Sequence, residues 1–528
     1  MNNIGAVHPN CVIFYKHHFY NIKYQYNPFN FLIELFFLLC YDFINRITGG
    51  NFMSKKKLFK HISLFMSVLF VLQAFAMPSY AFDKMPLTQE QWQNRYESLV
   101  TSNTLPLLCV GSDETELNIT WHADKNAAYP EVKLSEKADM SGAVMFTGEA
   151  VPAENDEQLV CRVTMTGIEE NTTYYYQYHS EKGWSKSAKY ESKAFDSYKM
   201  LVVGDIQIGG QTTDNPDEQS RIGYVWQSVL DEALTQNPDI SFLLSPGDNI
   251  STGKSADEWQ TLMMPTYVPS LPMALAIGNH DKKGFSYNYY TNMPNEFYGK
   301  YFEGLDRDFW FRYGDVLYLV FDATSGSAAD HRAMAAEAVA ANPDAKWRIA
   351  TMHQALYGAG YSMLDPETTI LLNGVFQPIF DMYNVDLVLT GHSHLQGRSK
   401  FIENGLIVGA AKSGKTYKNP IGRIYLNSNA CCDQGGAGSS IFSAYNFKEG
   451  DTTTYTTIEF SGDSMAVKTF RGDNSELLDS ITIVKTKEQK DSGFLIFLKR
   501  IPYALVELLG LVYMKIDNVV VKIRGGHF

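Results

Sequence analysis

The chain has 528 residues, more than one hydrophobic core usually contains, which favours two domains with extensions. Its formal net charge of −13 argues against nucleic acid as a partner, because a phosphate backbone requires a basic surface. With 45% hydrophobic residues and 20% charged residues, the composition is not that of a disordered chain.

The segment from Met53 to Ala81 has the pattern of a secretory signal peptide. Met53 opens a basic stretch, Ile62 to Phe75 is apolar, and Ser79 and Ala81 place small residues where a signal peptidase reads them. We therefore expect cleavage near Ala81 and a protein that is secreted or held at the cell surface or in a periplasm. Residues 1–81 hold seven Lys/Arg and two Asp/Glu, so the chain after them carries a formal charge of −18.

Residues 1–52 precede this signal and are rich in Phe, Tyr, Asn and Ile, as expected if AT-rich DNA upstream of the true start were translated. We interpret them as a falsely assigned extension. The alternative is a membrane anchor from Phe29 to Phe43, but Glu34 and Asp42 interrupt this run and it is short for a bilayer.

Residues 104–195 follow a short leader, in which Thr88 and Gln91 can start a helix. The segment is composed of short alternating strands separated by turns, for example over 116–121 and 159–164, which is typical of a β-sandwich. The tyrosine-rich segment from Gly167 to Tyr178 is similar to the corner-and-strand segment of fibronectin type III domains. Its side chains are expected in the core and at the corner.

From residue 197 the pattern alternates strands with helical stretches, which predicts layers of α and β structure. Helices are expected over 218–236 and 330–341, the second ending at Asn342-Pro343. Closing strands are expected over 453–460, 464–471 and 479–484.

Five apolar segments of this second domain end in residues that bind hard or borderline metal ions. They are Lys199 to Gln207, Asp239 to Asn249, Pro272 to Asp281, Trp347 to His353 and Val385 to His394. A core strand has no packing reason to finish in this way, whereas open α/β sheets build their sites at the carboxyl ends of strands. The sequence therefore predicts that the five ends meet in one metal site.

The series Gly-Asp205, Gly-Asp248-Asn249, Gly-Asn279-His280-Asp281, His353 and Gly-His392-Ser-His394 resembles the calcineurin-like metallophosphoesterase superfamily. Its details are most similar to the purple acid phosphatase branch, over roughly residues 104 to 486. The resemblance implies an α/β (α+β) four-layer sandwich over 197–486, with two sheets flanked by helices. An all-β, fibronectin III-like sandwich over 104–195 would precede it.

The resemblance, carried over residue by residue, implies two metal ions. Asp205 and His394 would hold the first ion with Asp248, and the second would be held by Asp248 with Asn279, His353 and His392. Asp248 suits the bridging role because a carboxylate has two oxygens to share. His392 and His394 lie two residues apart on an extended segment and so point to the same side, which supports their pairing independently.

The implied reaction is hydrolysis of a phosphoric ester. Ions held roughly 3.5 to 4 Å apart bind phosphate oxygens and lower the pKa of a bridging water, so that a metal-bridging hydroxide attacks phosphorus in line. His280 is expected to stabilise the transition state and protonate the leaving group, and Asp281 to orient His280. The alternative for His280 is a turn-capping role.

Three positions depart from or loosely match the family pattern. Gln207 stands where many members have a histidine, so it either offers a weaker amide oxygen or leaves the first ion one ligand short. Ser251 stands where purple acid phosphatases have a tyrosine, and we therefore expect two divalent ions, Mn²⁺, Zn²⁺ or Fe²⁺. Arg398 matches a family arginine and is a candidate for substrate binding, with a solvated or packing role left open.

Four cysteines remain after the signal peptide, and their spacing is not that of a disulfide-dense scaffold. A bridge between Cys109 and Cys161 is left open. Cys431 and Cys432 are expected as two free thiols in a glycine-rich loop, with a strained vicinal disulfide as the alternative.

Residues 487–528 form an apolar and basic tail. Lys499, Arg500, Pro502 and Glu507 interrupt the apolar residues and disfavour a spanning helix. Two alternatives stay open, an interfacial helix that makes peripheral membrane contact through residues 494–515 and a helix packed on the domain.

These inferences favour an exported, two-metal phosphomonoesterase, a metal-dependent and acid phosphatase-like hydrolase of small phosphorylated substrates. One alternative is a phosphodiesterase or nucleotidase using the same site. Another is a surface-binding protein whose sandwich engages a polymer and whose metal site is vestigial, although a vestigial site should have lost ligands. The loops at 284–301 and 357–363 are expected to read the leaving group.

Overall fold

The computed structural model describes residues 86–487, except for 127–128, 154–157, 181, 211–214, 283–285, 300–306, 325–326, 358–371, 432–437 and 448–451. The predicted upstream extension, the signal peptide and the tail beyond Lys487 lie outside these residues. Within the described ranges, no helix combines the length and apolar character needed to cross a membrane.

The described chain opens with helix α4 (Gln89–Leu99), which begins where the sequence predicted. The Thr88 side chain accepts from the Gln91 N–H, and the Gln91 side chain accepts from the Thr88 N–H, which completes a capping box. Trp92 Nε1 donates to the Ser220 carbonyl at 2.8 Å, so α4 is fastened to a helix of the second domain.

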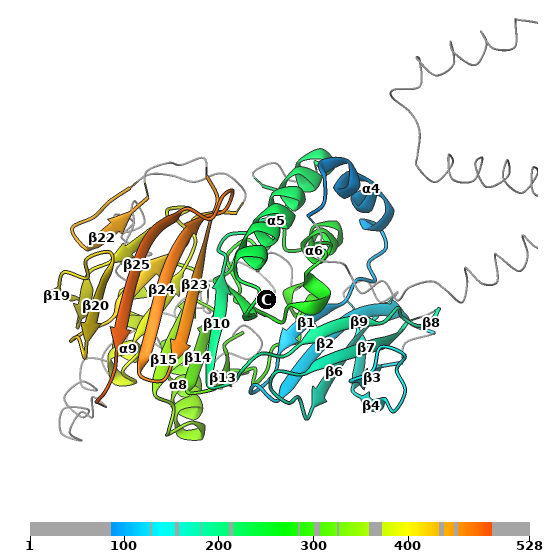
Figure 1. The fold of residues 1–528 in the computed structure, drawn as a ribbon, viewed down its shortest axis with the longest axis horizontal. Coiled ribbons are helices and arrows are strands. Elements are labelled where there is room, and N and C mark those ends of the chain that lie inside the picture. Colours follow the sequence, from blue (N-terminus) through cyan, green and yellow to red (C-terminus); the bar gives the residue numbers. More distant parts are fainter. Residues whose placement is uncertain are drawn as a thin grey trace, which may run out of the picture. The chain divides into compact units, whose positions relative to one another are not determined.

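A two-sheet β-rich domain follows (Figure 1). One sheet holds β1 (Leu107–Val110), β2 (Glu116–Asp124), β5 (Glu149–Pro152) and β6 (Gln158–Thr166). The other holds β3 (Glu131–Ser135), β4 (Val144–Thr147), β7 (Thr173–Ser180), β8 (Gly183–Trp184) and β9 (Ala188–Glu191). Inward side chains of both sheets, including Leu108, Trp121 and Tyr176, form their shared core. The Glu169 N–H donates to the Tyr174 hydroxyl at 2.9 Å, which ties the corner before β7 to this core.

The possible bridge between Cys109 and Cys161 does not form, and both thiols are free and buried. Strand β2 lies between the strands that carry them, with Cys109 opposite Asn118 and Cys161 opposite Trp121. Two strand spacings are about 9.5 Å, beyond the Cα separation that a disulfide spans. Cys431 is also free, whereas Cys432 lies outside the described residues.

The β-rich domain does not end at its own sheet, as a separate sandwich would. Strand β1 pairs in parallel with β12 (Met273–Leu275), so one sheet of eleven strands runs through both domains. Its order is β20-β25-β24-β23-β10-β11-β12-β1-β2-β6-β5. The members not yet given are β10 (Ser197–Val202), β11 (Ile240–Ser245), β20 (Lys415–Lys418), β23 (Thr454–Ser461), β24 (Ser464–Arg471) and β25 (Leu477–Val484).

A second sheet of seven strands packs against the first, in the order β13-β14-β15-β16-β21-β17-β22. These are β13 (Phe309–Tyr313), β14 (Val316–Phe321), β15 (Trp347–Met352), β16 (Leu387–Thr390), β17 (Gly397–Ser399), β21 (Ile424–Asn427) and β22 (Ser443–Asn446). Alternate residues of β14 face opposite cores: Tyr318 joins the core between the sheets, whereas Leu319 joins the core under the outer helices. A hairpin of β18 (Phe401–Glu403) and β19 (Leu406–Gly409) forms a separate two-stranded sheet, and Ile402 bridges to Arg423 beside β21.

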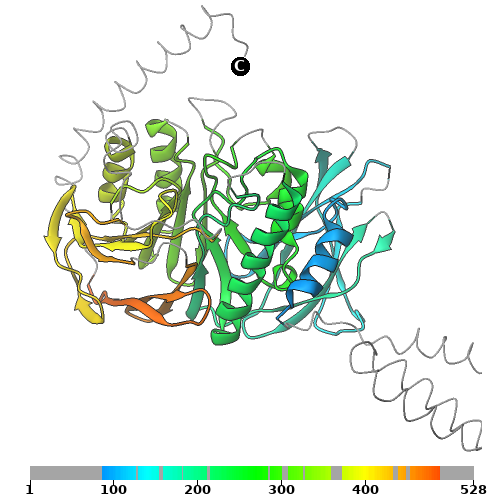
Figure 2. The ribbon, with the colours of Figure 1, turned by 90° about the horizontal axis from the view of Figure 1, so that it is seen from above.

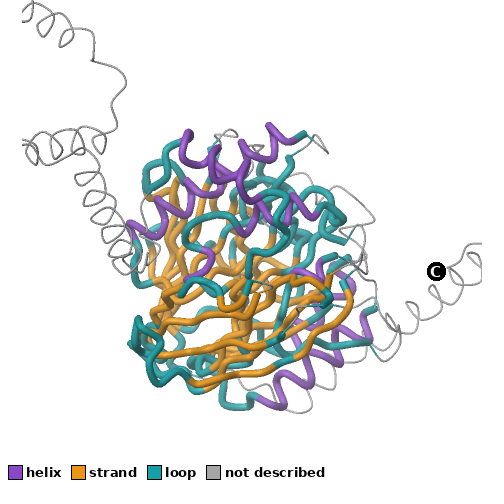
Figure 3. Tube along the Cα trace, turned by 90° about the vertical axis from the view of Figure 1, so that its right-hand side faces the viewer, coloured by secondary structure: helices purple, strands orange, loops and turns teal. Residues whose placement is uncertain are grey.

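Helices cover the outer faces of the two sheets, which gives four layers (Figures 2 and 3). Helices α5 (Pro216–Gln236) and α6 (Ala256–Met263) lie on the larger sheet, and α8 (Ala328–Ala341) and α9 (Leu372–Met382) on the smaller one. The 3-10 turn η1 (Val268–Ser270) and the short helix α7 (Tyr287–Tyr290) complete the described elements. The helices predicted over 218–236 and 330–341 are confirmed as α5 and α8, and the closing strands as β23, β24 and β25.

Candidate metal centre

The polar residues predicted at strand ends meet at one edge of the two packed sheets. Strands β10, β11 and β12 are parallel neighbours in the larger sheet, and β15 and β16 are parallel neighbours in the smaller one. Their carboxyl ends therefore lie on the same side. Direct contacts join the ends across the sheets: His353 Nε2 lies 2.9 Å from Asp248 Oδ2, and the His392 N–H donates to Asp205 Oδ1 at 2.9 Å.

In the loops after these strands, several residues have backbone conformations that residues other than glycine rarely adopt. Five residues have positive φ angles between 44° and 68°, namely Asp205, Gln207, Asp248, His392 and His394. Each such conformation costs of order 1 kcal/mol or more for a residue other than glycine. Because this strain gathers on candidate ligands, it indicates that the fold holds these side chains in place for a purpose other than stability.

Glycines at the motif turns are required by close approach of the candidate ligands. A Cβ on Gly278 would lie 2.1 Å from Asp248 Oδ1, and one on Gly391 would lie 2.4 Å from Asp205 Oδ2. Both distances are well inside van der Waals contact. The glycines of the Gly-Asn-His and Gly-His-Ser-His motifs therefore form a cradle that a larger residue would fill.

Asp248, His353 and His392 offer one donor atom each within 4.8 Å of one another. His353 Nδ1–H donates to the Pro246 carbonyl at 3.2 Å, so Nε2 is the ring nitrogen that faces Asp248 and that an ion would bind. Among the described residues, this buried Nε2 has no aligned hydrogen-bond partner, although Asp248 Oδ2 is close. Donors at right angles on one ion with bonds of about 2.1 Å lie about 3 Å apart, so the 2.9 Å separation fits two ligands of a shared ion.

The other predicted ligands lie beside this group. Asn279 Oδ1 is 3.0 Å from His392 Nδ1, again a separation that suits two ligands of one ion. His394 Nε2 lies 3.5 Å from Asp205 Oδ1. The donor set of carboxylate, amide and imidazole groups fits transition-metal ions of intermediate hardness. The structure thus brings all six predicted ligands together.

Charges in the centre shift the pKa values of its members. Burial alone would raise the pKa of Asp248, but the neighbouring His353 lowers it to about 2, so that Asp248 is ionised. Burial opposes the charged form of His353, yet Asp248 raises its pKa to about 9. A metal ion would take the place of that proton, because a ligating imidazole must be neutral. Burial, followed by the charge of His353, lowers the pKa of His392 and favours its neutral form.

His280 lies beside the candidate ligands, but Asp281 does not orient it as expected. The His280 N–H donates to Asp248 Oδ1 at 2.8 Å, and its Nδ1–H donates to the Ser251 carbonyl at 2.8 Å. The Ser251 carbonyl therefore fixes the tautomer and leaves Nε2 as the atom that exchanges a proton. Gln207 Nε2 lies 3.4 Å from this Nε2, so the amide of Gln207 faces His280.

Asp281 instead braces the loops that carry the ligands. Its fully buried carboxylate accepts from the backbone N–H groups of Asn249, Ile250 and Gly278 at 2.9 to 3.1 Å, and from the Asn249 amide at 3.0 Å. Burial, with the nearby charge of Asp248, raises the pKa of Asp281 to about 7. The role expected from the sequence was wrong because Asp281 is adjacent to His280 in the chain but points into the loop behind it.

Arg398 is likewise not placed for substrate. Its fully buried guanidinium donates to both carboxylate oxygens of Asp479 at 2.6 and 3.1 Å, and to the Ala411 carbonyl at 2.8 Å. Because the guanidinium is buried, it does not have the solvated role. Its hydrogen bonds are already made to Asp479 and Ala411. The packing role left open by the sequence is the one that the structure shows.

Glu258 supports the site and was missed in the sequence. Its carboxylate accepts from the backbone N–H groups of Ser251 at 2.9 Å and Thr252 at 2.7 Å, which holds the loop that carries the carbonyl facing His280. The sequence feature that could have pointed to Glu258 is the spacing Ser255-x-x-Glu258, which is typical of a capping box at the start of α6. The Glu258 side chain points away from the helix cap and toward the loop at Ser251 and Thr252. Only the tertiary packing determines this orientation.

Comparisons with known proteins agree with this architecture. The calcineurin-like phosphoesterase family matches residues 198–396, and the purple acid phosphatase N-terminal domain matches residues 106–192. No curated protein matches the chain in sequence. The purple acid phosphatase PPD1 from yellow lupin seeds shares the fold with a TM-score of 0.56 at 16% identity, covering 72% of this chain and 75% of its own. GAP50, the anchor in the inner membrane complex of Plasmodium, is similar over 59% of this chain and 96% of its own, at 14% identity and a TM-score of 0.37.

Proposed function

Because the chain carries a calcineurin-like phosphoesterase domain behind a purple acid phosphatase N-terminal domain, we propose that it hydrolyses small phosphate monoesters with two metal ions. The observation that supports this most directly is the convergence of six candidate ligands from five strand ends. A phosphoesterase family and a cluster of metal-binding side chains are both present.

The proposed ligand assignment gives each ion its own side chains and one in common. Asp205 and His394 would hold the first ion, Asn279, His353 and His392 would hold the second, and Asp248 would serve both. When bound, the two ions supply positive charge for the phosphate oxygens and acidify the attacking water. Asp248 is suited to the shared position because its two oxygens already face different neighbours, His353 on one side and the His280 N–H on the other.

His280 is proposed to act on the leaving group. With Nδ1–H committed to the Ser251 carbonyl, the protonated ring can donate only through Nε2. That proton passes to the ester oxygen as its bond to phosphorus breaks. Asp281 and Glu258 are positioning residues, since they hold the loops rather than face the reacting atoms.

The ions are proposed to be divalent, Mn²⁺, Zn²⁺ or Fe²⁺. The Ser251 hydroxyl donates to the Gly210 carbonyl at 2.6 Å, so it offers no anionic ligand that would favour a trivalent ion. Two tyrosines, Tyr287 and Tyr357, are considered as replacements for the missing ligand. Tyr287 donates to the Leu275 carbonyl, and burial raises its pKa well above its usual value. Burial also raises the pKa of Tyr357, to about 12.

The experiment that tests this function measures hydrolysis of mono- and diesters with added Mn²⁺, Zn²⁺ or Fe²⁺, together with the metal content. Asp248→Asn should abolish activity and weaken both ions, because one carboxylate serves both. Asn279→Ala should mainly reduce occupancy of the second ion. A substantially active Asp248→Asn protein would overturn the two-metal assignment, and a preference for diesters would replace the monoesterase by a phosphodiesterase.

Export through the signal at Met53 is proposed as part of this function, as is a fibronectin III-like character of the N-terminal β-rich domain. The corner hydrogen bond from the Glu169 N–H to Tyr174 supports that second proposal. Superposition of an experimental structure on fibronectin type III domains tests it, and a different strand connection would contradict it.

A further inference from the structure

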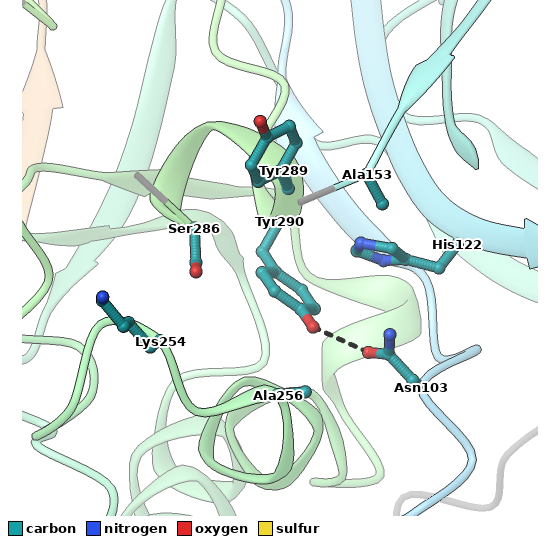
Figure 4. Close-up of a pocket in the computed structure, with 8 residues that line it drawn as sticks. All are labelled: Asn103, His122, Ala153, Lys254, Ala256, Ser286, Tyr289 and Tyr290. Carbon is teal, nitrogen blue, oxygen red and sulfur yellow. Dashed lines mark hydrogen bonds between the residues drawn. The ribbon is translucent and has the colours of Figure 1, made fainter. Parts of the chain in front are cut away.

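A cavity of about 240 Å³ lies between the N-terminal β-rich domain and the phosphoesterase domain (Figure 4). Both domains contribute to its wall. Its lining residues are Asn103, His122, Ala153, Lys254, Ala256, Ser286, Tyr289 and Tyr290. Aromatic rings, one ammonium group and a few polar side chains therefore surround a space of the size of a single substituted ring.

His122 presents an unpartnered polar group to this cavity. Its side chain is only 4% exposed, and neither ring nitrogen has a hydrogen-bond partner among the described residues. Burial, with the charge of Arg162, lowers its pKa to about 4. His122 is therefore a neutral imidazole at physiological pH, with one donor and one acceptor available to a ligand.

Packed aromatic side chains form the wall around His122. The Tyr290 ring lies 4.4 Å from the His122 ring, stacks on Trp259 at 5.1 Å and donates from its hydroxyl to Asn103 Oδ1 at 2.8 Å. Figure 4 shows the Tyr290 and His122 rings facing each other, with Asn103 bound to the Tyr290 hydroxyl. These contacts form the wall without a ligand, so a planar group can pack beside it.

Lys254 lines the cavity and belongs to the loop that contacts His280 in the candidate active site. Its exposed ammonium has no ion-pair partner among the described residues. The loop that carries it also holds His280: the Ser251 carbonyl accepts from the His280 ring, and the Gly253 N–H donates to the His280 carbonyl at 3.2 Å. Lys254, which lines the cavity, therefore directly follows Gly253, whose N–H contacts the His280 carbonyl.

We propose that this cavity receives the alcohol part of the substrate, a planar ring that carries a further negative charge such as a carboxylate. This inference rests on the proposed function, since His280 is the group that faces the leaving oxygen. The ring packs beside Tyr290 and His122, and its anionic substituent meets Lys254. Lys254 is then a specificity-determining residue, because an uncharged ring gains nothing from its ammonium.

The test compares hydrolysis of 4-carboxyphenyl phosphate and phenyl phosphate by the full chain. Lys254→Ala should lower kcat/KM for the carboxylated ester about threefold to fivefold, through KM, and leave phenyl phosphate unchanged, as an exposed charge contact predicts. Lys254→Arg should restore most of the preference. Lys468→Ala is the matched control, because Lys468 is an exposed lysine on β24 and does not line the cavity.

Binding of 4-hydroxybenzoate alone gives a readout that does not need turnover. We expect saturable quenching of tryptophan fluorescence, because Trp259 stacks on Tyr290, and weaker binding to Lys254→Ala. If the wild type hydrolyses both esters with the same efficiency, or Lys254→Ala keeps the preference, the inference is overturned while the phosphatase function stands. If neither ester is hydrolysed with any of the ions, the proposed function fails, and 4-hydroxybenzoate binding then decides the cavity on its own.

Discussion

At the scale of single residues, His280 depends on the atoms that fix its ring. The Ser251 carbonyl holds Nδ1, and Asp248 holds the backbone N–H, so the imidazole is oriented without binding an ion itself. We predict that His280→Ala keeps both ions and lowers turnover by roughly two to four orders of magnitude, the usual range for a lost acid-base group. Metal analysis and steady-state kinetics check this together. Loss of an ion, or turnover within a few-fold of wild type, would contradict the assigned role.

The second prediction at this scale rests on Ser251 and concerns the visible absorption of the protein. A ferric ion absorbs strongly in the visible range when a tyrosinate donates charge to it, and Ser251 stands where that tyrosine is expected. The Ser251 hydroxyl is instead bound to the Gly210 carbonyl. We therefore expect a colourless protein with two divalent ions when it is purified without added metal. A strong visible band with stoichiometric iron would show this expectation to be wrong.

At the scale of elements, the pair of Arg398 on β17 and Asp479 on β25 clamps the smaller sheet to the larger one. Both side chains are buried, with exposed fractions of 0% and 3%. Removing one partner strands an uncompensated charge, so Arg398→Met should lower the free energy of unfolding by about 3 to 5 kcal/mol. Chemical denaturation measures this loss.

The matched control for Arg398 is Arg221→Met, whose partly exposed pair with Glu218 on α5 contributes less than about 1 kcal/mol. Metal content and KM of Arg398→Met should stay near those of wild type. A raised KM with unchanged stability would restore Arg398 as a substrate-binding residue.

The end of the described chain gives a further prediction at this scale. Strand β25 is complete before the tail begins, and the Thr486 N–H donates to Asn419 Oδ1 at 2.8 Å. Deleting the residues after Ser492 therefore leaves the closing strand intact. If the tail is interfacial, the deletion should release the protein from membranes without loss of activity. Unfolding of the truncated protein with unchanged partitioning would show that the tail packs on the domain.

At the scale of the whole molecule, the two domains share one sheet, because β1 continues the larger sheet at β12. The N-terminal β-rich domain therefore buries part of its surface on the phosphoesterase domain. Two hydrogen bonds add to this join: the Asn118 amide donates to the Asn292 carbonyl at 3.1 Å, and the Asn292 amide donates to the Ile119 carbonyl at 3.2 Å. The cavity that we assign to the leaving group exists only because the domains are joined in this way.

The mature form of the molecule is the subject of the last prediction. If Met53 opens a signal peptide, mass spectrometry of the protein from its native host should find a mature start near Phe82. The reason is the small residues at Ser79 and Ala81, which a signal peptidase reads. Peptides that map to residues 1–52 in cell extracts would contradict the interpretation of that segment as a falsely assigned extension.

The sequence by itself determined the helices, the strands and the candidate ligands, because each depends on the order of residues close together in the chain. Apolar runs that end in Asp, Asn or His give the strands and the carboxyl ends at which Asp205, Asp248 and His353 stand. Cap spacing gives α4, as the Thr88 and Gln91 pair shows. These features depend on residues a few positions apart, which a single chain displays directly.

Only the tertiary structure decided which neighbours those residues meet. In the folded protein, Asp281 accepts from the backbone of Asn249 and Ile250. The His280 ring donates to the Ser251 carbonyl. Arg398 pairs with Asp479, which lies 81 residues away in the chain. The tertiary structure also joined β1 to β12 and so created the cavity beside Lys254. Such contacts follow from the packing of distant segments, in which a buried charge takes whichever partner the fold brings to it, and local order carries no record of that choice.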